Sequence, residues 1–321
     1  MTTKIVIIGG GTGTSTVLAG LRKYPLSLSA LISTADDGSS SGILCRAFGM
    51  APPGDLRQCL AALGDAGAEH LNYRFQKGPV RGHAIGNLLI ASAYERYGSI
   101  QQAMDMLARI FNAKGVLIPM TLTPTTLIAH LSAGRTLRGE SAITLARTIS
   151  TSLKKLVLAP LHIRANPRAV AALREADAII VGPGNLYASI LPHFLVPEIR
   201  RAFTASRAKK IYVANLATQR GHTDDFSVSD FLDVLDRRLG HDAFTHVLYN
   251  TAPLPVSGRA GKVAAAPVRP PTQRSKGITY AGARLAAASL KVSGAADPIA
   301  SRRNPFLHDA GRIAAAIIRC L

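Results

Sequence analysis

The stretch KIVIIGGGTG, from Lys4 to Gly13, decides the fold of this chain. The β-branched run Lys4–Ile8 predicts a short strand buried on both faces, as strands of parallel sheets are. The loop Gly9–Gly13 follows, and Thr14–Arg22 has apolar residues at helical spacing after N-capping hydroxyls, which predicts a helix. A second strand is expected over Leu28–Thr34, so the chain opens with a β-loop-α-β unit.

Further along the chain the same alternation continues. Strands are predicted over Ala178–Val181, Lys210–Ala214 and Thr245–Asn250, and helices over Gly54–Leu63, Asn87–Tyr97 and Asn166–Glu175. Strands that alternate with helices indicate an α/β fold, here a Rossmann-like, doubly wound, mainly parallel sheet with helices on both faces. We expect a single domain over residues 1–321, with a helical segment at about 43–110 covering the ligand crevice.

Two segments are left open by their sequence. Ser141–Leu158 carries mixed signals for helix and strand. The Pro/Gly-rich tract Pro253–Gly277 is basic and can be a loop, a linker or an arm.

Composition excludes several classes of protein. The chain has 321 residues, of which 47% are hydrophobic, so it is not intrinsically disordered. Its longest uncharged stretches, Gly115–Gly134 and Ala178–Pro197, are interrupted by prolines, and no signal-peptide apolar region is visible. We therefore expect no membrane span. The three cysteines form no CxxC pair, which favours free thiols in a cytoplasmic protein.

The charge is strongly positive, with 38 Lys and Arg against 19 Asp and Glu, a formal net charge of +19. Such a field attracts phosphorylated metabolites, nucleic acid or acidic membrane surfaces, although a solvated basic surface has the same composition. Only 5% of the residues are aromatic, and no RNP motif or Cys/His finger is visible. We therefore do not expect nucleic acid as a partner.

The glycine-rich loop is the first candidate site. Glycines allow backbone amides and a following helix N-terminus to approach a phosphate closely. Thr16 replaces the third glycine of the dinucleotide fingerprint, and no Lys follows as in a Walker A loop. A tight turn without a ligand would need the same glycines. The residues predicted to hold a phosphate or nucleotide are Gly10, Gly11, Thr12, Gly13, Thr14 and Ser15.

An acidic pair ends the second predicted strand. Asp36 and Asp37 lead into a turn containing Ser39 and Ser40, and this group can coordinate Mg²⁺, hold sugar hydroxyls or position a proton. The same residues can also form an Asx turn without a ligand. Nearby, Arg57 can reach a phosphate, whereas Asp55 is expected to cap the next helix.

Polar residues recur in later loops and at helix starts. Taken singly, each loop is a turn, but together they can converge on one crevice at the strand ends. No GxSxG, HExxH or CxxC motif indicates a nucleophile or a zinc site. The additional candidate nucleotide contacts are His83, Asn87, Asn185, Tyr187, Asn215, Thr218 and Gln219.

Together, these segments resemble the CofD/YvcK family, and more closely its YvcK branch, the gluconeogenesis factors. Little between Leu254 and Arg302 matches. The matching segments are Gly9–Gly13, Ala35–Gly42, Pro52–Arg57, Tyr73–Phe75, Gly82–Asn87, Gly139–Ser141, Gly182–Tyr187, Thr218–Asp224 and His308–Asp309.

This resemblance implies a cytosolic regulator of carbon metabolism, cell shape and cell-wall synthesis that binds a UDP-sugar, UDP-N-acetylglucosamine or UDP-glucose. The alternative comes from the CofD branch of the family. Resemblance to that branch implies a 2-phospho-L-lactate transferase that uses a GDP-type donor, a deazaflavin acceptor and Mg²⁺. We expect no tightly bound cofactor, with Mg²⁺ at Asp36 and Asp37 as the candidate metal. We also expect a homo-oligomer, and regulatory or cell-wall proteins as partners. No catalytic residue is assigned.

Overall fold

Seven parallel strands form the main sheet of the computed structural model, which describes residues 2–254, 265–288 and 306–321 apart from the side chain of Ser39. The sheet order is β10-β9-β8-β7-β1-β2-β3, and β1 lies between two strands whose connections leave in opposite directions. The predicted doubly wound α/β fold is therefore confirmed. The strands are β1 (Lys4–Gly9), β2 (Ser27–Ile32), β3 (Val116–Pro119), β7 (Ala178–Val181), β8 (Lys209–Val213), β9 (His246–Asn250) and β10 (Thr279–Ala283).

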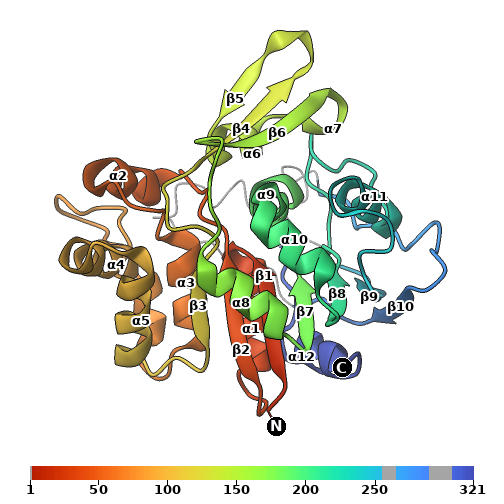
Figure 1. Ribbon diagram of the computed structural model, residues 1–321, viewed down its shortest axis with the longest axis horizontal. Coiled ribbons are helices and arrows are strands. Elements are labelled where there is room, and N and C mark those ends of the chain that lie inside the picture. The colour runs from red at the N-terminus through yellow and green to blue at the C-terminus, as the bar shows by residue number, and fades with distance from the viewer. Residues whose placement is uncertain (1, 255–264, 289–305) are drawn as a thin grey trace.

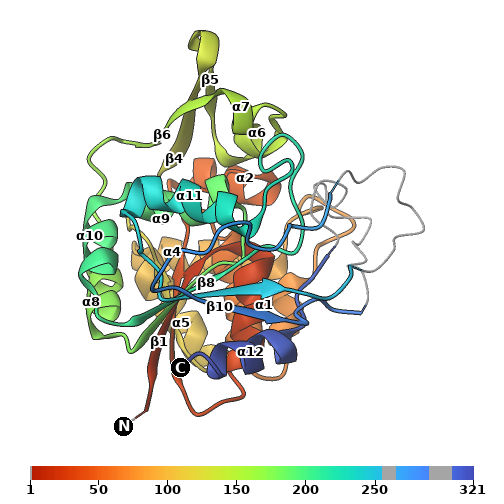
Figure 2. The ribbon, with the colours of Figure 1, turned by 90° about the vertical axis from the view of Figure 1, so that its right-hand side faces the viewer.

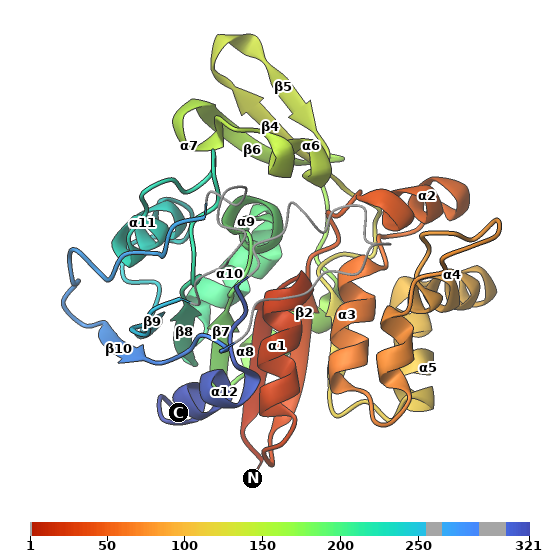
Figure 3. The same ribbon diagram turned by 180° about the vertical axis from the view of Figure 1, so that it is seen from behind.

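Helices cover both faces of this sheet (Figures 1 and 3). Side chains alternate across β1, so Ile5 and Ile7 join one core, while Val6 and Ile8 join the other. The first core includes α1 (Gly11–Leu21), α2 (Ser39–Phe48), α3 (Gly54–Leu63), η1 (Ala68–Asn72), α4 (Ile85–Tyr97), α5 (Ile100–Ile110) and α12 (Ala310–Ile318). The second includes α8 (Pro167–Glu175), η3 (Leu186–Ile190), α9 (Leu191–Leu195), α10 (Pro197–Ala205) and α11 (Val228–Leu239).

A small antiparallel sheet of order β5-β4-β6 projects beyond the carboxyl ends of the main strands (Figures 1 and 2). Its leucines pack into the second core. The segment 141–158, whose sequence gave mixed signals, forms two short helices followed by a strand at the edge of this sheet. The elements of this layer are β4 (Thr126–Leu131), η2 (Ser132–Gly134), β5 (Thr136–Arg138), α6 (Glu140–Leu145), α7 (Ile149–Ser152) and β6 (Leu153–Ala159).

The predicted elements match closely in position. The helix α3 has the predicted bounds, and α8 begins at Pro167 after the capping side chain of Asn166. The helix α1 begins earlier than expected, because Gly10 is already its N-cap. The residues Gly11–Gly13 therefore form the first helical turn rather than a loop.

Part of the basic tract 253–277 lies outside the described residues, namely 255–264. The remainder packs against the segment after β8, where the Thr218 amide donates to the Ala266 carbonyl at 2.7 Å and the Val268 amide donates to the Leu216 carbonyl at 3.0 Å. That part is therefore a packed loop. Among the described helices, none is both long and apolar enough to cross a membrane.

Candidate functional site

A cavity of about 530 Å³ lies at the carboxyl ends of β1, β7 and β8. This is the switch point between β1 and β7, where the connections of a doubly wound sheet diverge and ligands bind. Its walls come from the starts of α1 and α3, the loops after β2, β7 and β8, the helix α6, and the segment Phe306–His308.

The glycine segment brings bare backbone to this cavity. Gly11 has a φ of 64°, and a Cβ on Gly10 would collide with the Asp55 carboxylate. A Cβ on Gly13 would collide with the Pro183 carbonyl, so the loops after β1 and β7 touch. The N-cap residue, Gly10, makes no side-chain hydrogen bond to the first turn of α1. The N-terminus of this helix lies at the cavity as an anion-binding element, beside the Asp55 carboxylate.

Three carboxylates gather at one side of the cavity. Oxygen atoms of Asp36, Asp37 and Glu140 lie within 4.8 Å of one another. Asp36 Oδ1 accepts the Gly38 amide at 2.9 Å, and Asp37 Oδ1 accepts the Ser141 amide at 2.8 Å. Their oxygen-only composition suits a hard cation such as Mg²⁺. The local sequence around Asp36 could not reveal Glu140, which is distant in the chain and joins the cluster through the small-sheet layer.

A buried network holds Arg57 beside the cavity. Its side chain is only 4% exposed, and its Nε donates to Asn87 Oδ1 at 3.0 Å. Asn87 Nδ2 donates to Ser40 Oγ at 3.0 Å, and His83 Nδ1 lies 3.0 Å from the same hydroxyl. Neither His83 nor Asn87 lines the cavity. Both residues therefore position Ser40 and Arg57, which do line it.

The loops after β7 and β8 are tied together by amide side chains. Asn215 Nδ2 donates to the Gly184 carbonyl at 2.9 Å, and Asn185 Nδ2 donates to Gln219 Oε1 at 2.9 Å. Gln219 Nε2 reaches the Thr144 carbonyl of α6 at 3.3 Å. The Thr218 hydroxyl accepts the Ala266 amide at 3.2 Å. These polar residues give the cavity wall a fixed shape.

The structure brings most of the predicted site residues together. Other predicted residues do not line the cavity. The hydroxyls of Thr14 and Ser15 donate to backbone carbonyls at the start of their own helix, and Tyr187 is buried. Asp37 lies just outside the lining. Ser39 begins α2, and its side chain is outside the described residues. The predicted residues that line the cavity are Gly10, Gly11, Thr12, Gly13, Asp36, Ser40, Arg57, Asn185, Asn215, Thr218 and Gln219.

Sequence reasoning missed several lining residues, among them Arg74, Arg147 and Arg220. The capping role expected for Asp55 is wrong, because α3 begins at Gly54 after Pro53 without a side-chain cap. Asp55 instead places its carboxylate against Gly10. Arg74 and Arg220 lie in two of the family-like segments, Tyr73–Phe75 and Thr218–Asp224, but nothing local to them indicated that they meet Arg147 at one cavity.

Two orphaned polar atoms also mark this cavity. Ser33 Oγ and His308 Nε2 are buried with no hydrogen-bond partner among the described residues, and both residues line the wall. Burial lowers the pKa of His308 to about 4, so its imidazole is neutral at physiological pH.

Fold and cavity together define a doubly wound α/β protein with a polar, arginine-bearing pocket at its switch point. The family model for the 2-phospho-L-lactate transferase CofD matches residues 5–285. The chain belongs to the CofD family, and its similarity to gluconeogenesis factors places it in the YvcK-like branch.

The relatives support this placement. Gluconeogenesis factors of Listeria innocua and Bacillus subtilis are 38% and 37% identical over 256 residues, covering 78% of this chain and 79% and 80% of theirs. A relative in Nostoc sp. is 41% identical over 241 residues, but the match spans only 52% of its length. A solved UPF0052-family protein of Bacillus halodurans, 29% identical, superposes with a TM-score of 0.86 over 99% of each chain.

Proposed function

We propose that this protein is a cytoplasmic regulator that binds a UDP-sugar and links its supply to carbon metabolism, cell shape and cell-wall synthesis. The observation that carries the proposal is the cavity at the β1/β7 switch point. It combines the N-terminal turn of α1 with four arginines, Arg57, Arg74, Arg147 and Arg220. Amides and guanidinium groups bind phosphate oxygens, so the diphosphate would lie against Gly10–Gly13.

The remaining lining suits the uncharged parts of such a ligand. Ser33, Asn185 and Thr218 line the cavity with hydroxyl and amide groups. These groups include hydrogen-bond donors and acceptors, which a sugar or a base would need. The names of the relatives favour a role in gluconeogenesis. Regulation through partner proteins and a homo-oligomeric state belong to the same proposal.

Mg²⁺ would bind at Asp36 and Asp37, with Glu140 as a third oxygen donor. When bound, the ion would offset the charge of these carboxylates and of a neighbouring diphosphate. The protein's own contribution is to hold the three side chains: the amides of Gly38 and Ser141 orient Asp36 and Asp37, and the Thr144 hydroxyl donates to Glu140 at 2.6 Å.

A second candidate function is phospholactyl transfer from a GDP-type donor to a deazaflavin, the activity in the name of the matching family model. The acidic cluster at the cavity edge favours it, because such a group can bind Mg²⁺ or accept a proton.

Calorimetric titration separates the two functions. The ligands are UDP-N-acetylglucosamine, UDP-glucose, GDP and a deazaflavin, each with and without MgCl₂. Binding of UDP-sugars alone supports the regulator. Binding of GDP together with the deazaflavin, followed by product formation with the phospholactyl donor, overturns it.

A matched pair of variants tests the location. Arg220→Gln removes a cavity cation, and we expect the Kd for the UDP-sugar to rise about tenfold, as loss of one charged hydrogen bond predicts. Arg109→Gln removes an exposed cation at the end of α5 and should leave the Kd unchanged. Equal affinities in both variants would exclude Arg220 from the site.

A further inference from the structure

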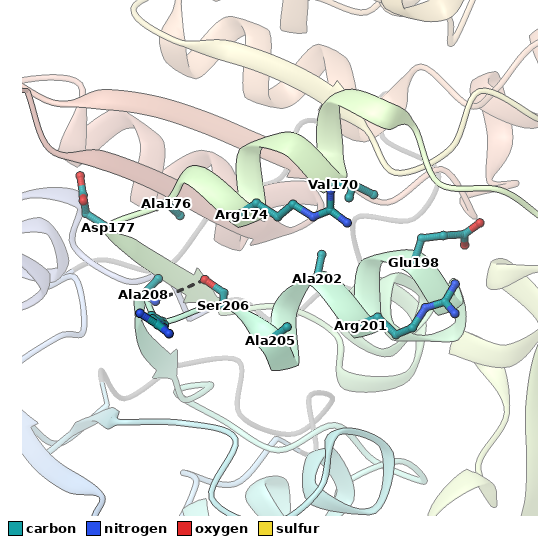
Figure 4. A pocket seen from close by; sticks show the side chains of 11 residues that line it. Val170, Arg174, Ala176, Asp177, Glu198, Arg201, Ala202, Ala205, Ser206 and Ala208 are labelled. Carbon is teal, nitrogen blue, oxygen red and sulfur yellow. Dashed lines mark hydrogen bonds between the residues drawn. The ribbon is translucent and has the colours of Figure 1, made fainter.

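A second cavity, of about 730 Å³, lies between α8 and α10. Figure 4 shows it as a groove between the two helices. It includes Asp177, just before β7, and Ala208, just before β8. It is therefore at the amino ends of these strands, whereas the candidate site is at their carboxyl ends, and the two cavities share no lining residue.

Three arginines from separate segments line this groove. Arg174 lies in the last turn of α8, Arg201 lies in α10, and Arg207 follows α10; all three side chains are exposed. Arg174 and Arg201 extend along the groove from facing helices (Figure 4). In the described part of the chain, none of the three guanidinium groups has a hydrogen bond or an ion pair. Arg168 on the same α8 is different, because it binds both carboxylate oxygens of Asp105 at 2.7 and 2.8 Å.

The groove also contains two acidic residues, at its opposite ends (Figure 4). The Asp177 carboxylate accepts a hydrogen bond from the Lys4 amide at 2.8 Å, so it is held by the first residue of β1. Glu198 lies at the other end, near Arg201, and its Oε2 is buried without a hydrogen-bond partner among the described residues. Between them the floor consists of small residues, namely Ala176, Ala202, Ala205, Ser206 and Ala208. The middle of the groove is thus open, shallowly apolar and flanked by cations.

We infer that this groove is a second binding site, for a small compound that carries at least two phosphate groups. Guanidinium groups bind phosphate oxygens in a two-pronged geometry, and unpaired ones avoid the cost of breaking existing ion pairs. The volume falls within the range of about 300–1,000 Å³ that is typical of small-molecule sites. The small side chains leave room for the body of the ligand.

Inorganic pyrophosphate is the probe for this site, measured by equilibrium dialysis with the full chain in 150 mM NaCl. The test variant is Arg174→Gln combined with Arg201→Gln. The control is Arg135→Gln combined with Arg138→Gln, two exposed residues flanking and within β5 that remove the same charge. We expect the test variant to lose one equivalent of bound pyrophosphate, or to bind it at least tenfold more weakly, while the control matches the wild type.

Three results would overturn the inference. If both variants lose affinity equally, the binding reflects diffuse positive charge. If the test variant melts at a lower temperature with unchanged pyrophosphate binding, the arginines only stabilise the carboxyl ends of the helices. If single-stranded DNA displaces pyrophosphate from the wild type and binds through Arg174 and Arg201, the groove is part of a nucleic-acid surface.

Discussion

At the scale of single residues, burial of imidazole groups gives the protein a defined pH dependence. Burial lowers the pKa of His193 and of His308 to about 4 from 6.5. The unfolded chain takes up these protons first as the pH falls, so the stabilising contribution is present above pH 6.5 and is lost on the way to pH 4. His308 alone should lower the free energy of unfolding by about 2 kcal/mol between pH 7 and pH 5.

Urea titrations at both pH values check this prediction. In His308→Gln the fall in unfolding free energy from pH 7 to pH 5 should be about 2 kcal/mol smaller than in the wild type. His70→Gln is the control, because the side chain of His70 is 74% exposed. An identical pH dependence in the wild type and in His308→Gln would contradict the prediction.

The carboxylate cluster predicts a dependence on magnesium. Asp36→Asn with Glu140→Gln removes two negative charges whose oxygens lie within 4.8 Å of each other. Without metal, the melting temperature of this variant should be equal to or above that of the wild type, because the repulsion between the carboxylates is relieved. With MgCl₂, only the wild type should be stabilised further.

Differential scanning fluorimetry without MgCl₂ and with about 10 mM MgCl₂ measures both effects. The higher concentration is chosen to come close to saturating an ordinary Mg²⁺ site. Glu95→Gln, on the exposed side of α4, is the matched control. An equal MgCl₂ response in all three proteins would place magnesium elsewhere.

At the scale of elements, the start of α1 and the loop after β7 approach each other closely at the candidate site. Gly13→Ala would drive a Cβ into the Pro183 carbonyl, so one of the two segments must move. We expect a loss of roughly 1–3 kcal/mol, which is typical of overpacking. Gly184→Ala is the control in the same loop pair, since its nearest neighbour lies at an ordinary 3.6 Å.

Chemical denaturation reports the stability of both variants, and ligand titration reports the site. Gly13→Ala should lose both stability and UDP-sugar affinity, whereas Gly184→Ala should keep the stability of the wild type. Equal stability of the two variants would show that the segments after β1 and β7 do not constrain each other.

The central strands and the loops that follow them could be predicted from the sequence because the information is local. The run Lys4–Ile8 is apolar throughout, and glycines and polar residues stand where the strands end. The small sheet could not be predicted, since β5 has three residues and β6 mixes lysines with leucines. Arg147, which reaches the cavity through that layer, carried no signal in its own neighbourhood, and Glu140 stood out only as part of the family-like segment Gly139–Ser141.

At the scale of the whole molecule, the net charge of +19 acts against compactness. Raising the ionic strength from about 10 to about 150 mM shortens the Debye length from about 30 to about 8 Å. The repulsion between arginines on different elements should therefore weaken, and the melting temperature should rise by a few degrees.

Thermal melts in NaCl and in Na₂SO₄ at equal ionic strength measure this effect. Equal shifts would indicate screening alone, and a larger shift in sulfate would add the general stabilisation that comes from exclusion of sulfate from the protein surface. A melting temperature that falls with added NaCl would mean that attractive ion pairs, such as Arg168–Asp105, outweigh the repulsion.

The two layers of the molecule divide the cavity between them. One wall comes from loops of the parallel sheet, and the other from α6 and Arg147, which lie in the chain between β5 and β6 of the small sheet. A change of length between α6 and α7, where Ala146 and Arg147 line the cavity, would therefore reshape this wall without disturbing the strands of the main sheet. Related proteins can thus differ in ligand preference while the strands of their main sheet stay the same. Exchanging residues 126–159 between two relatives is therefore a direct way to alter ligand selectivity.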